Sequence, residues 1–92
     1  MMKKITKGRV KYYKDRILLV VNKKHNSAFK CTFNDYSGDI VWIKVKNIYS
    51  KGKDAIKSDS RSVLVPTDNI YLLEKSEEPE YRINELLLAI KI

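Results

Sequence analysis

The chain alternates apolar and polar residues over several short stretches, and this period of two predicts β-strands. The clearest case is "IVWIKVKN" at residues 40–47. Val41, Ile43 and Val45 share one face there and would face a core, whereas the opposite face would carry Ile40, Trp42, Lys44 and Lys46.

Four further stretches complete the β pattern. Residues 9–21 combine a short alternation at 9–13 with the continuous apolar run "ILLVV" at 17–21, which predicts a strand buried on both faces. Residues 28–35 alternate, with Cys31 on their apolar face. Shorter β segments lie at 62–66 and 70–75. Five short strands of this kind are typical of a small barrel.

Two segments depart from this pattern. Residues 50–62, "SKGKDAIKSDSRS", have few apolar residues and no clear period, which predicts a mobile basic loop. Residues 77–92 begin with glutamates around Pro79 and continue with apolar residues at helical spacing. We therefore expect a barrel over residues 1–76 and an amphipathic helix over 77–92. This helix is apolar on more than one side, so it should dock on the barrel and contact a partner through Ile83, Leu86, Leu87, Leu88, Ile90 and Ile92.

The segment "SVLVPTDNIYLLEK" resembles the closing segment of Src-homology-3-like barrels. Those barrels end with a strand, a proline, a one-turn 3₁₀ element and a final strand, which Val65-Pro66, residues 67–69 and residues 70–73 match in order. The resemblance extends over residues 6–75. It implies a mainly β fold, a small five-stranded SH3-like barrel with a C-terminal α-helix. Lysines stand where the peptide-binding version carries acids, so the bacterial and phage barrels that bind nucleic acid are the closer likeness.

The chain also shows a weaker likeness to enzymes. "GDIVWIKVKN" followed by "SRSVLVPTDN" is similar to the opening of barrel-type endoribonuclease toxins of toxin–antitoxin modules. Here the segment begins at residue 38 instead of near residue 1, and Ser62 replaces a proline. His25 and Cys31 stand alone, and no phosphate loop, nucleophile elbow or zinc-type cysteine pair occurs. We therefore expect no enzyme activity, no metal and no cofactor.

Charge is unevenly distributed along the chain, whose formal net charge is +8. Residues 1–66 hold 16 Lys and Arg against 5 Asp and Glu, whereas residues 67–92 hold 3 against 6. A basic body predicts an anionic partner. The plain alternative is that these lysines are solubility charge.

Composition favours a particular origin. The chain has 15 Lys and 10 Ile against 3 Gly and 2 Pro, a bias typical of an AT-rich genome. We expect a phage or mobile-element product, with a low-GC bacterium as the alternative source. No apolar run has the length of a membrane span, and no apolar stretch follows the basic N-terminus as in a signal peptide. The expected location is the cytoplasm, that of the host if a phage encodes the protein.

Aromatic and basic residues interleave on the predicted outward face. Single-stranded nucleic acid needs such a surface, because bases stack on rings while lysines neutralise phosphates. We predict a small basic protein that binds RNA or single strands through Arg9, Lys11, Tyr13, Lys30, Trp42, Lys44, Lys46, Lys51, Lys53, Lys57 and Arg61. In the competing interpretation, the C-terminal helix covers Trp42 and the lysines are merely solvated.

A second function stays open. Short phage proteins often act by occupying a surface, so the chain could be an inhibitor of a host or defence protein such as a nucleic-acid enzyme. The apolar excess of the C-terminal helix favours this interpretation, or a homodimer formed through that helix.

Overall fold

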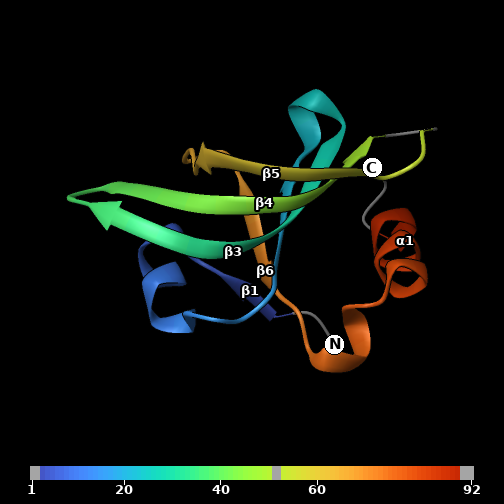
Figure 1. Cartoon of the computed structure of the whole chain (residues 1–92), viewed down its shortest axis with the longest axis horizontal. Helices are drawn as coiled ribbons and strands as arrows, with labels where there is room; N and C mark the ends of the chain where they lie inside the picture. The colour runs from blue at the N-terminus through green and yellow to red at the C-terminus, as the bar shows by residue number, and fades with distance from the viewer. Residues whose placement is uncertain (1–2, 51–52, 90–92) are drawn as a thin grey trace.

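A single antiparallel sheet organises the chain in the computed structural model, which describes residues 3–50 and 53–89. Its six strands are β1 Lys3–Ile5, β2 Leu18–Asn22, β3 Ser27–Ser37, β4 Ile40–Ser50, β5 Ile56–Val63 and β6 Asn69–Leu72, in the spatial order β1-β6-β2-β3-β4-β5 (Figure 1). The helical elements described are the 3₁₀ turns η1 Lys7–Tyr13, η2 Lys23–His25 and η3 Lys75–Glu77, and the helix α1 Glu80–Ala89. The predicted mainly β class with a C-terminal helix is confirmed. The predicted number of five strands is wrong, and the sheet is open, with β1 and β5 at its edges.

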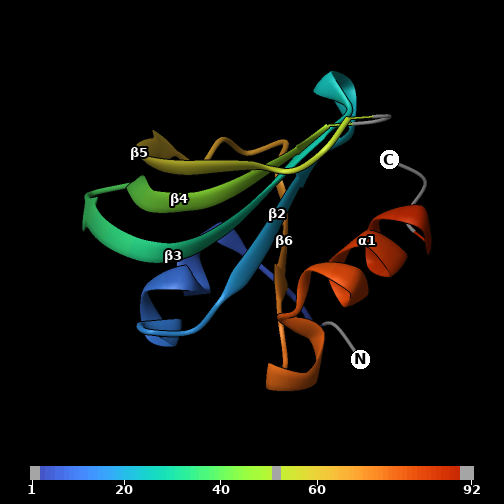
Figure 2. The same cartoon turned by 45° about the vertical axis from the view of Figure 1, so that its right-hand side comes forward.

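The long strands β3 and β4 form a hairpin whose tip lies at the opposite end of the molecule from α1 in both Figure 1 and Figure 2. Gly38 and Asp39 make the turn, and Gly38 has a φ of +58°, a left-handed conformation that glycine adopts without steric cost. The predicted alternation of β4 is confirmed on its apolar side, because Val41, Ile43 and Val45 are all buried.

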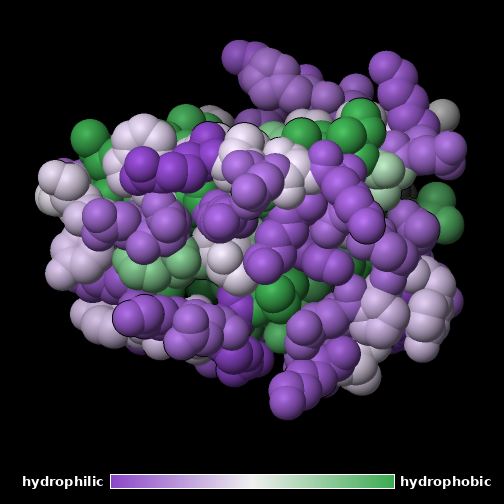
Figure 3. All heavy atoms as spheres, in the orientation of Figure 1, coloured by the Kyte–Doolittle hydropathy of each residue, from purple (hydrophilic) through white to green (hydrophobic). Residues whose placement is uncertain are grey.

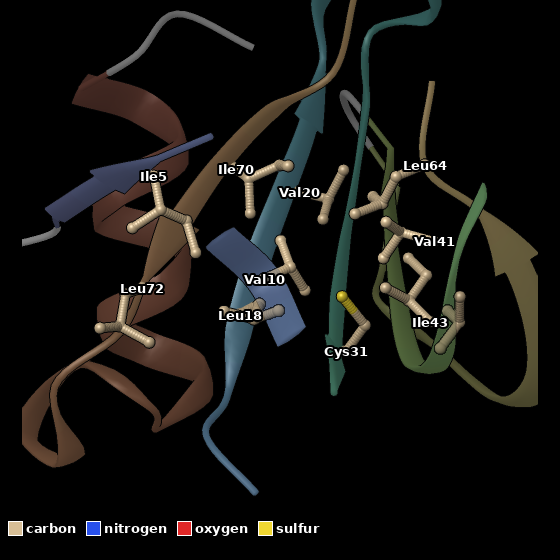
Figure 4. Packing of buried hydrophobic residues seen from close by; sticks show 11 residues of the cluster. Ile5, Val10, Leu18, Val20, Cys31, Val41, Ile43, Leu64, Ile70 and Leu72 are labelled. Carbon is tan, nitrogen blue, oxygen red and sulfur yellow. The ribbon is translucent and has the colours of Figure 1, made fainter. Parts of the chain in front are cut away.

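The main hydrophobic core lies on one face of the sheet, which we call the inner face. Figure 4 shows side chains from the sheet and from η1 pointing toward one another there. The buried members are Ile5, Val10, Leu18, Val20, Cys31, Val41, Ile43, Val45, Leu64, Ile70 and Leu72. The core therefore joins the sheet to η1, which covers its inner face.

Residues 9–13 belong to η1 and do not form the predicted strand. Val10 is fully buried and Tyr13 packs against the same core, whereas Tyr12 is 71% exposed. Residues three apart share one face of a 3₁₀ helix, so Val10 and Tyr13 reach the core together. The alternation seen in the sequence was too short to distinguish this period from that of a strand.

β2 is buried on both of its faces, as the run "ILLVV" predicted. Leu18 and Val20 belong to the inner core, whereas Leu19 and Val21 lie on the outer face beneath α1 (Figure 2). The cluster on the outer face consists of Leu19, Val21, Ala28, Tyr49, Leu73, Ile83 and Leu87. The predicted docking of the C-terminal helix on the β-structure is confirmed.

The helix begins later than the predicted residue 77. Its first residue is Glu80, and the carbonyl of Pro79 accepts a hydrogen bond from the Ile83 N–H at 3.1 Å. The preceding glutamates serve η3 instead, where the Glu74 N–H donates to Oε1 of Glu77 at 3.0 Å. Glu77 is therefore buried in a turn and does not lie in the first turn of the helix.

The mobile loop predicted at residues 50–62 is wrong over its second half, where β5 pairs with β4. The register places Arg61 opposite Lys44 and Val63 opposite Trp42. β5 carries serines where a central strand would be apolar, at positions 58, 60 and 62. Because β5 is the last strand of the sheet and is largely exposed, its sequence shows no hydrophobic alternation from which a strand could have been predicted.

Asp68 fixes the turn between β5 and β6. Its carboxylate accepts hydrogen bonds from the Val65 N–H at 2.9 Å and from the Asn22 side chain at 3.1 Å. The turn itself lies at Pro66 and Thr67, and β5 ends at Val63, so only the first two residues of the strand predicted at 62–66 are strand. The link to Asn22 ties this turn to the end of β2.

Candidate nucleic-acid interface

The outer face of β4 and β5 carries a row of basic residues beside the tryptophan. We call this surface the outer patch and define it as Trp42, Lys44, Lys46, Lys57 and Arg61. Strand pairing brings Arg61 opposite Lys44, and Lys57 opposite Asn47. All four basic side chains are exposed. The two strands thus assemble residues that are up to 19 positions apart in the sequence.

Trp42 is half-buried and lies under Arg61. The guanidinium carbon of Arg61 is 4.6 Å from the centroid of the Trp42 ring, within the range of a cation–π interaction. Trp42 belongs to neither of the two core clusters, and α1 packs on other residues of the outer face. The competing interpretation that the helix covers Trp42 is therefore wrong. The side chain that lies over the ring is that of Arg61, from the neighbouring strand.

Acidic residues reduce the charge of the outer patch only in part. The Lys44 ammonium lies 3.1 Å from Oδ1 of Asp59, and the two side chains are 48% and 83% exposed. An ion pair so open to solvent contributes little and exchanges easily. Lys46 lies at an irregularity in the pairing of β4 with both neighbours, and its side chain is exposed. The side of the molecule seen in Figure 3 is likewise covered mostly by hydrophilic residues.

Lys30 serves the attachment of α1. Its ammonium lies 3.5 Å from Oε1 of Glu80, and its side chain is 19% exposed. The Tyr49 hydroxyl donates to the same Glu80 oxygen at 2.9 Å. These contacts join β3 and β4 to the first residue of the helix. Lys30 therefore helps to hold the helix on the sheet and does not belong to the outer patch.

Tyr49 should resist ionisation in alkali until the protein unfolds. Its pKa is raised above the ordinary value of about 10 by burial, and further by the hydrogen bond to Glu80 and the charge of that carboxylate. The contribution of the protonated Tyr49 hydroxyl to the stability of the fold is fully present below a pH of about 10 and is lost as pH rises through the raised pKa. Phenolate absorbance should therefore show a late step that coincides with unfolding and disappears in Tyr49→Phe. A titration of the wild-type protein without a late phenolate step would contradict the raised pKa of Tyr49.

Arg9, Lys11 and Tyr13 lie on η1, on the inner side of the sheet, and not beside the outer patch. Tyr13 packs on the core, so only the two basic residues are exposed. The Lys11 ammonium lies 4.9 Å from the ring centroid of Tyr36 and 5.5 Å from that of Tyr12.

A pocket of about 140 Å³ opens beside these groups. η1 and the tip of the hairpin provide its lining, which consists of Lys7, Gly8, Lys11, Tyr36, Gly38, Asp39 and Val41. The sequence prediction missed Tyr12 and Tyr36 as site residues. Tyr12 stood on the same side as Val10 in the alternation at 9–13, and Tyr36 stood next to the Gly38 turn, outside the alternating segments. An aromatic residue beside a glycine turn was the available signal.

The remaining predicted residues are placed as follows. Lys53 is exposed, and Lys51 lies outside the described residues. Three of the predicted partner-binding residues stabilise the fold instead. Ile83 and Leu87 are buried between α1 and the sheet, and Leu86 packs against the same outer-face cluster. Leu88 is 77% exposed. Ile90 and Ile92 lie outside the described part of the chain.

The chain matches no family model, and comparisons with curated proteins and with solved structures found no significant similarity. Within residues 3–50 and 53–89, no three His, Cys, Asp or Glu side chains gather as metal ligands would. No helix in these ranges has the length and apolar character needed to cross a lipid bilayer.

Proposed function

We propose that the protein binds single-stranded nucleic acid, RNA in particular, through the outer patch. The observation that carries this proposal is the stack of Arg61 on Trp42 beside the exposed Lys44 and Lys46. A base can replace the guanidinium on the indole ring while Arg61 turns to a phosphate. Stacking and phosphate neutralisation are the two contributions that single strands require.

The charge at the hairpin tip favours single strands over the groove of a duplex. A two-stranded ribbon fits the DNA major groove in size, but the tip of this hairpin carries Asp35 and Asp39, both exposed. Carboxylates at the leading end would meet phosphates on both sides of a groove. The flat outer face of β4 and β5 instead offers a stacking platform.

The likeness to SH3-like nucleic-acid barrels supports the same proposal. A strand, a turn at Pro66 and Thr67, and a final strand follow one another in the expected order, but the one-turn 3₁₀ element expected at residues 67–69 is not present, and β6 begins at Asn69. We propose this relation for the fold, and a phage or mobile-element origin for the chain, on the sequence features alone.

Binding of labelled single-stranded RNA, duplex RNA and duplex DNA, followed by fluorescence anisotropy, tests the proposal. Single-stranded RNA should bind most tightly. If four phosphates are neutralised, its affinity should fall about 50-fold between 50 and 200 mM salt. Failure of all three to bind at the lower salt concentration would refute the function and leave the lysines as solubility charge.

The emission of Trp42 provides a direct check of the site. The sequence contains one tryptophan, so its fluorescence reports this position alone. Stacking of a base on the ring should quench the emission in parallel with the anisotropy change. Binding without any change in tryptophan emission would place the nucleic acid elsewhere, with Lys7, Lys11 and Tyr36 as the next surface to examine.

A second candidate function is inhibition of a host or defence protein through α1. Leu88 is 77% exposed and Tyr81 is 65% exposed on the helix. A contact through these side chains would depend on salt far less than nucleic-acid binding does. Capture of a host protein that survives high salt and is lost in Leu88→Glu would favour this function.

A further inference from the structure

β5 offers an open edge for pairing. In the parts of the chain that the structure describes, β4 is its sole strand partner. The Leu64 N–H donates to the Val41 carbonyl at 3.0 Å, so Leu64 faces β4. Backbone groups alternate in direction along an antiparallel strand. The N–H and C=O groups of Asp59, Arg61 and Val63 therefore point away from the sheet, as unsatisfied pairing groups.

The side chains of this edge alternate between two kinds. Lys57 and Arg61 lie on the outer face, as their pairing with Asn47 and Lys44 requires. Asp59 shares that face, since it reaches Lys44. The other face carries small hydroxyl groups, with the oxygens of Ser58 and Ser60 2.8 Å apart. β5 also lacks proline along its eight residues, so nothing blocks an added strand.

Charge order along β5 makes the strand complementary to itself in two antiparallel registers. An axis at Ser58 would place Asp59 opposite Lys57 but would overlap only residues 56–60 of the strand, whereas an axis at Ser60 overlaps residues 57–63 and is therefore favoured. With the twofold axis at Ser60, Asp59 of each copy lies opposite Arg61 of the other. An axis at Asp59 would place two carboxylates together, and an axis at Arg61 would place two guanidinium groups together. Opposite charges across a pair of strands stabilise it, and like charges destabilise it.

We propose that two copies of the chain pair through β5, antiparallel and centred on Ser60. The interface is isologous, as a twofold dimer requires. In this register Val63, 37% exposed, lies opposite Lys57, whose methylene stem can cover it. Both outer patches lie on the same face of the joined sheet, so the dimer presents one basic surface instead of two. Because both copies are strongly basic, the dimer should tighten as salt rises, opposite to nucleic-acid binding.

A single cysteine at the axis tests the register. Ser60 would face its own copy in a non-hydrogen-bonded pair, where Cα atoms lie about 4.5 Å apart, close enough for a disulfide. Ser60→Cys should therefore give a covalent dimer under mild oxidation. Ser58→Cys and Ser62→Cys are matched controls. In each of these single variants the new cysteine would lie opposite a serine of the other copy, so the variant should remain monomeric on a non-reducing gel. The native Cys31 should stay silent, since it is fully buried and burial, with the Asp68 charge, raises its pKa to about 12.

Sedimentation of the full chain without nucleic acid tests the energetics, so its result is independent of the proposed function. Asp59→Arg and Arg61→Asp should each weaken dimerisation about tenfold or more, because two like-charged pairs replace two complementary ones. The double exchange should restore it, and Leu88→Glu should leave it unchanged. A monomer at all concentrations, equal cross-linking at the three serine positions, or no rescue in the double exchange would overturn the proposal.

Discussion

Replacing Ile83 by Ala should lower the free energy of unfolding by about 2–5 kcal/mol. Ile83 is fully buried between α1 and the outer face of the sheet, in the cluster that contains Leu19 and Leu73. Removing its branched side chain leaves a cavity where the helix meets β2, and both the lost burial and the cavity destabilise the fold. A domain of this size has a total stability of about 5–15 kcal/mol. The variant should therefore unfold at a markedly lower urea concentration.

Leu88→Ala is the matched control for this measurement. It removes a side chain of similar size from the same helix, but Leu88 is 77% exposed. We expect a change within about 0.5 kcal/mol. Equal losses in the two variants, measured by urea titration at constant slope, would mean that α1 does not dock through Ile83.

Reversing two charges of the outer patch should have the largest effect on nucleic-acid binding. At 0.1 M salt, each phosphate contact on a single strand is worth about fivefold in affinity through counterion release. Loss of two contacts in Lys44→Glu with Lys46→Glu should therefore weaken binding about 25-fold, and repulsion by the new carboxylates adds to this. Both lysines are exposed, so the variant should remain folded. The slope of affinity against salt should also become shallower.

The control variant carries the same change in net charge at a different place. Lys23 and Lys24 are exposed on η2, outside the outer patch. Lys23→Glu with Lys24→Glu should reduce affinity much less if binding is local. Equal weakening by the two double variants would show that general charge attraction, and not the surface around Trp42, accounts for binding.

The strands that were predicted best from the sequence are those in which burial determines the residue type on each face. β2 was recognisable because both faces are covered, and β4 because its inner residues are apolar without exception up to Val45. β1 was missed, and only Ser62 and Val63 of β5 were predicted as strand, for the opposite reason. Each lies at an edge and is largely exposed, so its formation depends on a neighbouring backbone and leaves little trace in residue type.

The candidate site was predictable as a set of residues but not as an arrangement. Trp42, Lys44 and Lys46 share a strand, so the alternation alone placed them together. The position of Arg61 over Trp42 depends on the pairing of β4 with β5. The ion pair of Lys30 with Glu80, which takes Lys30 out of the candidate site, depends on where the helix begins. Such contacts join segments distant in sequence, and composition and spacing carry no information about them.

The double burial of β2 has a consequence for how the chain folds during synthesis. β2 pairs with β6, and its outer face is covered by α1, so two of its partners are made well after β2 itself. Until then, four consecutive apolar residues from Leu18 to Val21 have no complete shelter. Contacts over such separations form slowly, and exposed strands of this kind are prone to aggregate. A fragment that ends before residue 69 would therefore leave these residues exposed and be prone to aggregate.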